Sequence, residues 1–323
     1  MNTFEKLKQD VPEIQKGILL KNFTTYKIGG PAEYFFIAKN EKDLLSALKS
    51  ARKLKLPITV LGGGSNLLVS DKGIKGLVVK ISMSEARIRG NKAFVQAGSS
   101  LTELACKSAK MGFAGLEWSG GVPGTIGGAI YGNAQAFGEK ISDAVESAKA
   151  IDLKTLKLKN FTKKQCRFTL KNSIFKQNKN LVIVSAVLKF KKGKADGLND
   201  TIKEHLYYRR TNHPINFSSA GSVFVNPEIK IQDKKLLEKF PELSGYNERR
   251  VIPAGYLIAK SGLAGKKIGN AQISEKHCNF IINLGGAKAD DVISLMNLAQ
   301  KNVKENFGIK LEPEIQRVGF GEK

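Results

Sequence analysis

The spacing of apolar and polar positions predicts a β-α-β unit near the start of the chain. Residues 33–38 are apolar and aromatic like a buried strand, and Asn40 can cap the helix that follows. The apolar face of that helix carries Leu44, Leu45, Leu48, Ala51 and Leu54. A second strand at 57–61 leads directly into a glycine loop at 62–66. The loop therefore follows the carboxyl end of a strand, where α/β folds place ligands.

The rest of the chain alternates short strands with helices. Glycines stop the expected helices at Gly112 and Gly308. In the middle we expect strands at 77–81, 93–97, 148–158 and 181–190 and helices at 101–111 and 201–210. Beyond them we expect strands at 222–225 and 279–283, helices at 254–260 and 290–307, and an extended tail at 311–318. The pattern predicts an α+β protein in three parts.

Composition indicates an ordinary globular protein. Hydrophobic residues make up 41% and charged residues 25%, which does not favour disorder. No run approaches the roughly 18 apolar residues that a membrane span needs, and residues 1–10 lack the apolar core of a signal peptide. We therefore expect a cytoplasmic protein without membrane insertion. The scattered cysteines and histidines predict no disulfide framework and no metal site; they are Cys106, Cys166, Cys278, His205, His213 and His277.

The formal net charge of +24 admits a nucleic-acid-binding protein as a non-enzyme alternative. However, only nine of the 53 basic residues are arginines, and the lysines are spread over the whole length. Base recognition favours arginine forks in a localised stripe. A solvated lysine-rich surface is therefore the better interpretation, and its field would attract anionic nucleotides.

Two glycine loops are the first candidates for chemistry. The 62–66 loop fails the dinucleotide fingerprint, because Leu67 occupies the third glycine position, and a turn without ligand is an alternative. The second loop, 120–128, has five glycines among nine residues, which favours close approach of the backbone to a ligand. Packing glycines at a crowded helix–strand contact are the alternative there. Together the loops indicate an extended ligand with a diphosphate.

Six segments carry a resemblance to a known family. They are TTYKIGGPAEYF (24–35), LGGGSNLLV (61–69), GLEWSGGVPGTIGGAIYGNA (115–134), AGSVFVNP (220–227), GLAGKKIGNAQISEKHCNFIIN (262–283) and LEPEIQRVG (311–319). In this order they resemble the UDP-N-acetylenolpyruvoylglucosamine reductases over nearly the whole chain. The absence of an identifiable tyrosine-bearing insertion suggests the shorter, second type of this family.

The resemblance implies a fold and a cofactor. It implies the two-subdomain FAD-binding fold of the vanillyl-alcohol oxidase class with a C-terminal α+β substrate-binding domain. The expected domains are 1–76, 77–205 and 206–307, followed by a tail at 308–323 that returns to the active site. The residues implied to bind FAD are Gly62, Gly63, Gly64, Ser65, Asn66, Gly121, Gly124, Thr125, Gly127 and Gly128.

The implied reaction is the reduction of UDP-N-acetylenolpyruvoylglucosamine to UDP-N-acetylmuramate in peptidoglycan synthesis, with NADPH as reductant. Flavin N5 would deliver hydride to the vinyl C3, and C2 would then need a proton. The sugar nucleotide and NADPH are the expected partners, without nucleic acid, and a monomer is expected. An oxidase or dehydrogenase of the same flavin class acting on another substrate is the rival enzyme hypothesis.

The resemblance assigns roles to three catalytic candidates. Ser222 falls where the family has its proton donor, although the residues alone indicate an ordinary strand serine. Glu314 matches the acidic residue expected to hydrogen-bond the developing enol, which requires it to be protonated or paired with a cation. Lys171 replaces the arginine of a family Tyr-Arg pair, so it keeps the charge but loses the planar fork.

Three further residues are expected to contact the nucleotide diphosphate or sugar by their position alone. They are Arg209, Asn226 and His277. A packed, purely structural role for His277 is an equal alternative.

Overall fold

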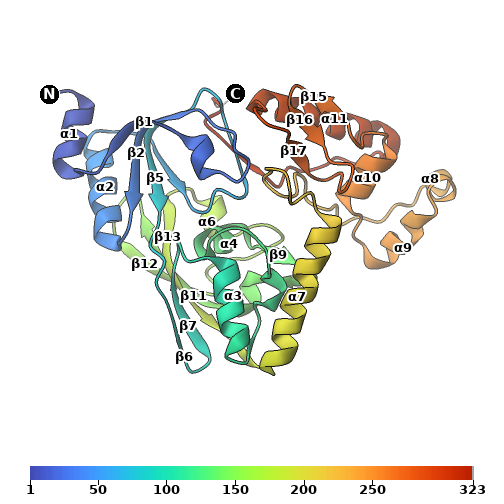
Figure 1. Ribbon diagram of the computed structural model, residues 1–323, viewed down its shortest axis with the longest axis horizontal. Coiled ribbons are helices and arrows are strands. Elements are labelled where there is room, and N and C mark those ends of the chain that lie inside the picture. The colour runs from blue at the N-terminus through green and yellow to red at the C-terminus, as the bar shows by residue number, and fades with distance from the viewer. Residues whose placement is uncertain (322–323) are drawn as a thin grey trace. The chain divides into compact units, whose positions relative to one another are not determined.

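The computed structural model describes residues 1–321, so the last two residues of the expected 308–323 tail lie outside the described part. Contacts divide the chain into two compact units (Figure 1). Unit 1 contains Met1–Ile18, Pro31–Gly64 and Ile74–Thr211, and unit 2 contains Leu19–Gly30, Ser65–Gly73 and the chain from Asn212 onward. Each unit has its own hydrophobic core. The chain therefore passes from one unit to the other several times.

Unit 1 begins with a four-stranded sheet that contains the predicted β-α-β unit. Its strand order is β1 (Gln15–Leu19), β2 (Pro31–Ala38), β5 (Ile74–Ile81) and β3 (Ile58–Leu61). β5 pairs in parallel with both β2 and β3 and so separates them. Helix α2 (Glu41–Lys53) begins as predicted, since the Asn40 side chain accepts a hydrogen bond from the Asp43 amide at 2.9 Å. Helix α1 (Thr3–Asp10) packs against α2.

A second sheet in unit 1 is antiparallel. Its strand order is β12 (Leu158–Thr162), β11 (Val145–Asp152), β13 (Leu181–Lys189), β7 (Lys92–Gln96) and β6 (Ala86–Arg89). The strand expected at 148–158 is confirmed for 148–152, but its continuation to 158 is wrong, because the chain turns between β11 and β12. The Asp152 side chain accepts hydrogen bonds from the amides of Lys154 and Thr155, and Leu156 has a φ of 56°. Such an aspartate turn competes with strand hydrogen bonding.

Helices and short strands complete unit 1. The helices are α3 (Leu101–Lys110), α4 (Ile126–Gly132), α5 (Ile141–Ala144), α6 (Ile174–Gln177) and α7 (Ala195–Asn212), with a 3-10 turn at Glu117–Ser119. The short strands are β8 (Phe113–Ala114), β9 (Gln135–Ala136), β10 (Glu139–Lys140) and β14 (Lys191–Lys192). The expected helices at 101–111 and 201–210 are confirmed by α3 and α7.

Unit 2 packs a long helix against a small antiparallel sheet. The sheet consists of β15 (Lys267–Ile268), β16 (Ala271–Ile273) and β17 (Ile281–Asn283), and helix α11 (Ala289–Phe307) packs against its first two strands. Helix α11 ends as predicted at Gly308, which has a φ of 69°. The remaining elements are a 3-10 turn at Leu20–Phe23, helices α8 (Lys234–Lys239), α9 (Glu242–Arg249) and α10 (Ala254–Lys260), and the parallel pair β4 (Leu67–Val69) and β18 (Gln316–Val318).

The segment Leu19–Gly30 belongs to unit 2 because Tyr26 is anchored there. Its side chain is fully buried, and its hydroxyl donates a 2.8 Å hydrogen bond to the carbonyl of Ile281. The Asn283 side chain in turn donates to the Tyr26 carbonyl at 3.0 Å. Burial raises the pKa of the Tyr26 hydroxyl far above its ordinary value, so the hydroxyl stays protonated and remains a donor.

Candidate functional site

The first glycine loop follows β3 and presents free amide groups. Gly64 has a φ of 66°, a conformation that glycine adopts without strain. Across the part of the chain that the structure describes, the amides of Gly63 and Gly64 donate no hydrogen bond. Successive free N–H groups around a left-handed residue form a concave anion-binding site. The loop is therefore shaped to accept an oxyanion.

In the second loop, some amides donate hydrogen bonds within the protein and others have no acceptor there. The Ile126 amide donates to Ser99, the Gly127 amide to Ala97 at 2.8 Å, and the Gly128 amide to the Thr125 hydroxyl at 3.3 Å. Those three amides therefore already have acceptors within the protein. Among residues 1–321, no acceptor is assigned to the amides of Gly121, Gly124 and Thr125. Of the glycines expected to bind FAD here, Gly127 and Gly128 are thus explained by packing and capping.

The two loops lie against each other within unit 1. A Cβ atom on Gly62 would lie 2.8 Å from the Thr125 hydroxyl oxygen, and one on Gly63 would lie 2.9 Å from the Cα of Gly124. Such distances are too short for real side chains, so only glycine allows this approach. The packing alternative therefore accounts for part of the glycine content. The free amides of both loops remain available to a diphosphate, and the residues present fit that group.

Ser65 and Asn66, the last residues of the first loop, belong to unit 2. The Asn66 side chain donates to the Glu314 main-chain carbonyl at 3.2 Å. The main-chain carbonyl of Asn66 accepts a hydrogen bond from the Gln316 amide at 2.9 Å. These two bonds attach the loop end to the segment that contains Glu314.

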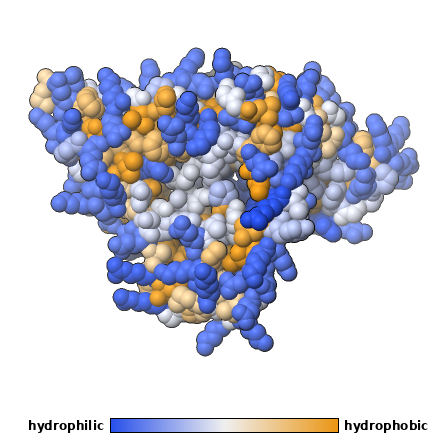
Figure 2. Space-filling model, viewed as in Figure 1, coloured by the Kyte–Doolittle hydropathy of each residue, from blue (hydrophilic) through white to orange (hydrophobic). Residues whose placement is uncertain are grey.

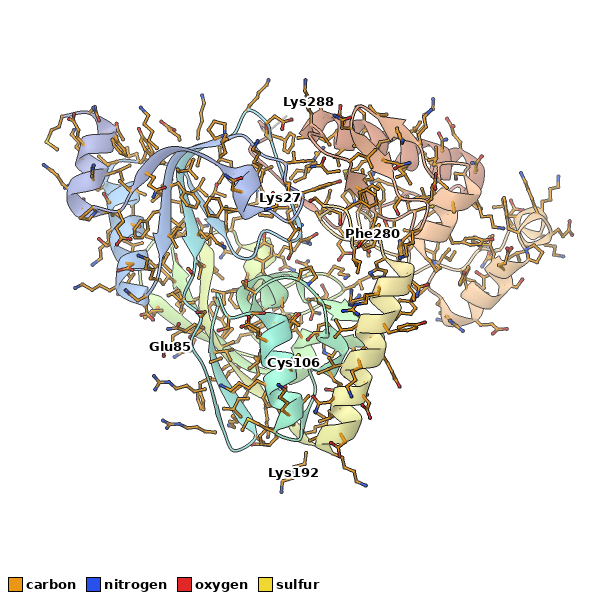
Figure 3. The ribbon with its side chains drawn as sticks, in the orientation of Figure 1. Lys27, Glu85, Cys106, Lys192, Phe280 and Lys288 are labelled. Atoms are coloured by element: carbon orange, nitrogen blue, oxygen red, sulfur yellow. The ribbon has the colours of Figure 1, made fainter. Side chains whose placement is uncertain are left out.

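Ser222 lies in a segment that Asn279 holds in place. The strand expected at 222–225 is wrong: Ser222 forms only an isolated bridge with Phe280, which Figure 3 labels, and Phe224 forms another with Pro313. Asn279 replaces a neighbouring strand here. Its main-chain carbonyl accepts from the Val223 amide at 2.8 Å, and its side chain both accepts from the Phe224 amide and donates to the Phe224 carbonyl.

Glu314 is attached to the same segment. Its amide donates a 2.7 Å hydrogen bond to the carbonyl of Val223, the residue after Ser222. Ser222 and Glu314 are both half-buried. Unit 2 therefore brings together the two residues expected to donate the proton and to stabilise the enol.

Lys171 belongs to unit 1 and occupies a strained turn. Thr169 and Asn172 exchange two backbone hydrogen bonds around it, and Lys171 has a φ of 51°. A positive φ is uncommon for a lysine and costs conformational energy. The Lys176 ammonium donates to the Lys171 carbonyl at 2.9 Å and so holds the turn.

The three residues expected to contact substrate each have a partner in the protein. The Arg209 guanidinium donates to the Gly120 carbonyl at 3.1 Å, and its burial lowers its pKa. The Asn226 side chain accepts from the Ala254 amide at 3.0 Å, at the start of α10. The His277 ring accepts from the Asn279 amide at 3.3 Å, and burial lowers the pKa of this imidazole. Arg209 thereby supports the second glycine loop.

Sequence reasoning missed two residues that shape these sites. Asn279 is a polar residue within the apolar run at 278–282, and it is only 2% exposed. Lys80 is a lysine within the otherwise apolar β5, and its ammonium donates to the Gly62 carbonyl at 2.9 Å. A polar residue inside an apolar run was the available signal in both cases.

Two absences apply to the described part of the chain. None of its helices has the length and apolar character to span a membrane. Within residues 1–321, no cluster of three or more histidine, cysteine or acidic side chains is arranged to hold a metal ion.

Two protein-family models match this chain, one in each half. The model of an FAD binding domain matches residues 32–155. The model of the UDP-N-acetylenolpyruvoylglucosamine reductase C-terminal domain matches residues 213–318.

Individual relatives cover nearly the full length. The UDP-N-acetylenolpyruvoylglucosamine reductase of Caldicellulosiruptor bescii is 39% identical over 97% of this chain and 93% of its own. That of Anoxybacillus flavithermus is 35% identical over 98% of this chain and 99% of its own. The crystal structure of UDP-N-acetylenolpyruvylglucosamine reductase from Thermus caldophilus is 28% identical, with a TM-score of 0.75 over 95% of this chain and 99% of that one. These matches confirm the expected α+β fold with an FAD-binding domain, and the chain belongs to the UDP-N-acetylenolpyruvoylglucosamine reductase family.

Proposed function

We propose that this chain reduces UDP-N-acetylenolpyruvoylglucosamine to UDP-N-acetylmuramate with NADPH and bound FAD, in the synthesis of peptidoglycan precursors. Family membership over nearly the whole chain supports the reaction. The residue roles rest on one observation: the segment after Ser222 is hydrogen-bonded to both Asn279 and Glu314. Asn279 binds the main chain of Val223 and Phe224, and the Glu314 amide donates to the Val223 carbonyl.

The glycine loops are proposed to hold FAD through its diphosphate. The free amides of Gly63, Gly64, Gly121, Gly124 and Thr125 would donate to the diphosphate oxygens. The other residues assigned to the cofactor shape the loops or contact adjoining groups; they are Gly62, Ser65, Asn66, Gly127 and Gly128. When bound, the flavin supplies hydride transfer from NADPH to carbon C3 of the vinyl group.

The chain's own residues then handle the proton and the charge. After C3 is reduced, C2 requires a proton, and the Ser222 hydroxyl donates it. A serine hydroxyl is a weak acid, so this step depends on fixed geometry, which the hydrogen bonds to Val223 and Phe224 provide for the main chain. Glu314 hydrogen-bonds the developing enol, and Lys171 supplies positive charge for it without the arginine fork.

The remaining assignments are part of the same proposal. Arg209, Asn226 and His277 contact the sugar nucleotide in addition to their partners within the protein. The proposed functional division is 1–76, 77–205 and 206–307 with the tail at 308–323, although Leu19–Gly30 and Ser65–Gly73 of the first part belong to unit 2. The protein acts in the cytoplasm as a monomer.

An anaerobic two-step experiment tests this function. NADPH should bleach the absorbance of the bound flavin, and addition of the enolpyruvyl sugar nucleotide should restore it. Ser222→Ala should leave the first step within about twofold and slow the second by at least about 100-fold, the range for a lost general acid. Ser244→Ala, an exposed serine on α9, is the matched control and should change neither step.

Two results would count against the proposal. Equal slowing of both steps by Ser222→Ala would remove the proton-donor role. A purified protein that cannot be loaded with FAD would end the flavoenzyme assignment altogether.

A further inference from the structure

Lys80 fixes the carbonyl group at the start of the first glycine loop. It lies on β5, between the buried residues Val79 and Ile81, and is itself half-buried. Its ammonium donates a 2.9 Å hydrogen bond to the carbonyl oxygen of Gly62. A lysine at this position therefore links the middle of the sheet to the loop beside it.

The charge of Lys80 has no carboxylate partner within residues 1–321. Burial lowers the pKa of its ammonium, because half-buried surroundings disfavour the charged form. Half-buried charges are usually paired, because desolvation costs free energy that a partner offsets. An anionic ligand beside the loop would be such a partner.

The hydrogen bond from Lys80 to the Gly62 carbonyl also orients the Gly63 amide, because both groups lie in one peptide plane. The Gly62 carbonyl and the Gly63 amide belong to one peptide unit, and no cis peptide occurs in the described chain. In a planar trans peptide the C=O and N–H groups point in opposite directions. Fixing the carbonyl toward Lys80 therefore directs the Gly63 amide away from it, and that amide has no acceptor in residues 1–321.

The packing of the loop limits its rotation. The position of a Cβ on Gly63 is filled by the Cα of Gly124 at 2.9 Å, and Gly64 continues the turn with a φ of 66°. A rotation of the 62–63 peptide would break the bond to Lys80. The direction of the Gly63 amide is thus set by the contact with Lys80 together with the packing of the loop.

We propose that Lys80 is a positioning residue for the cofactor diphosphate, which holds the Gly62–Gly63 peptide so that the Gly63 amide donates to a diphosphate oxygen. This inference rests on the proposed FAD binding and extends it to a residue outside both glycine loops. Lys80 acts through the peptide and takes no part in the reduction itself.

The test is the dissociation constant for FAD, measured by dilution of the flavin-loaded protein and recovery of flavin fluorescence. Lys80→Met keeps the aliphatic stem and should weaken FAD binding at least about tenfold, which corresponds to about 1.4 kcal/mol. Lys80→Arg restores a charged donor and should recover most of the affinity. Lys75→Met, an exposed lysine on the same strand, is the matched control and should leave the dissociation constant unchanged.

The outcomes separate this inference from the proposed function. Wild-type affinity in Lys80→Met, or equal losses in the methionine and arginine variants, would overturn the role of Lys80. Should Lys80→Met fail to fold, Lys80→Leu replaces it, since leucine also lacks a donor, with the same expectation relative to Lys80→Arg. If wild-type protein binds FAD but does not reduce the enolpyruvyl sugar nucleotide, the proposed function fails while the comparison of Lys80 variants still decides this inference.

Discussion

At the scale of single residues, Asn279 should make a large contribution to stability. Its side chain satisfies both backbone groups of Phe224, which is 1% exposed. Asn279→Ala leaves these two groups buried without a partner, and each such group costs about 1–3 kcal/mol. We expect the free energy of unfolding, measured in urea, to fall by about 2–4 kcal/mol.

The matched control for Asn279 is Asn297→Ala, because Asn297 is an exposed asparagine on α11 of the same unit. An exposed substitution of this kind should change the free energy of unfolding by no more than about 0.5 kcal/mol. Similar values for the two variants would show that the Phe224 backbone is not held as described.

His277 should make stability depend on pH. Burial holds its folded-state pKa below the ordinary value of about 6.5, so between these two values the unfolded chain binds more protons than the folded protein. The free energy of unfolding therefore rises with pH through this window and falls as the solution is acidified from about pH 6.5. His277→Gln should flatten the curve of unfolding free energy against pH in this range.

His205→Gln serves as the control for this pH experiment. His205 lies in unit 1, where its ring stacks on Phe137 with centroids 3.8 Å apart. The slope of the curve should change in the His277 variant more than in the His205 variant. An unaltered slope in His277→Gln would contradict the assignment.

At the scale of elements, substitutions of Gly63 and Gly132 by alanine should have opposite effects on stability, because only Gly63 lies at the contact between the two glycine loops. In Gly63→Ala the new Cβ would meet the backbone of Gly124 at 2.9 Å, so the loops must separate. Overpacking of this kind costs about 1–3 kcal/mol. Gly132→Ala places a methyl group in open space at the end of α4, where alanine is the better helix former, and should stabilise by about 0.5–1 kcal/mol.

Urea unfolding of both glycine variants measures this difference. A Gly63→Ala protein as stable as the wild type would mean that the loops do not approach each other closely. The Gly132 variant shows whether the assay resolves a change of the expected size.

Elements with strong local signals were predictable, and those without them were not. The helices α2, α3 and α11 carry apolar residues at helical spacing, and Asn40, Gly112 and Gly308 each mark one of their boundaries, so these bounds follow from local chemistry. The second half of the strand expected at 148–158 and the strand expected at 222–225 failed for two different reasons. An apolar run cannot show whether an aspartate will turn the chain, or whether a side chain such as that of Asn279 will take the place of a neighbouring strand.

At the scale of the whole molecule, the net charge of +24 should accelerate binding of anionic nucleotides. Hydrophilic side chains cover much of the visible face in Figure 2, consistent with a lysine-rich solvated surface. We expect the second-order rate constant for flavin reduction by NADPH to fall as ionic strength rises, because salt screens this attraction. The rate at saturating NADPH should stay constant.

Stopped-flow absorbance at several salt concentrations measures both rate constants. A bimolecular rate that does not respond to salt would show that the surface charge has no part in attracting the nucleotide. Binding to unrelated DNA with a steep salt dependence would instead favour the nucleic-acid alternative.

The sequence by itself determined the two glycine loops, the amphipathic helices and the ordered motifs of the family, because these depend on residues close together along the chain. Only the tertiary structure decided which distant groups meet. Tyr26 enters the core of unit 2 and bonds to Ile281, Lys80 holds Gly62, and Asn279 holds the segment of Ser222. Hydrophobic periodicity reports which face of an element is buried, whereas the partner of a buried polar group depends on the packing of segments far apart in sequence.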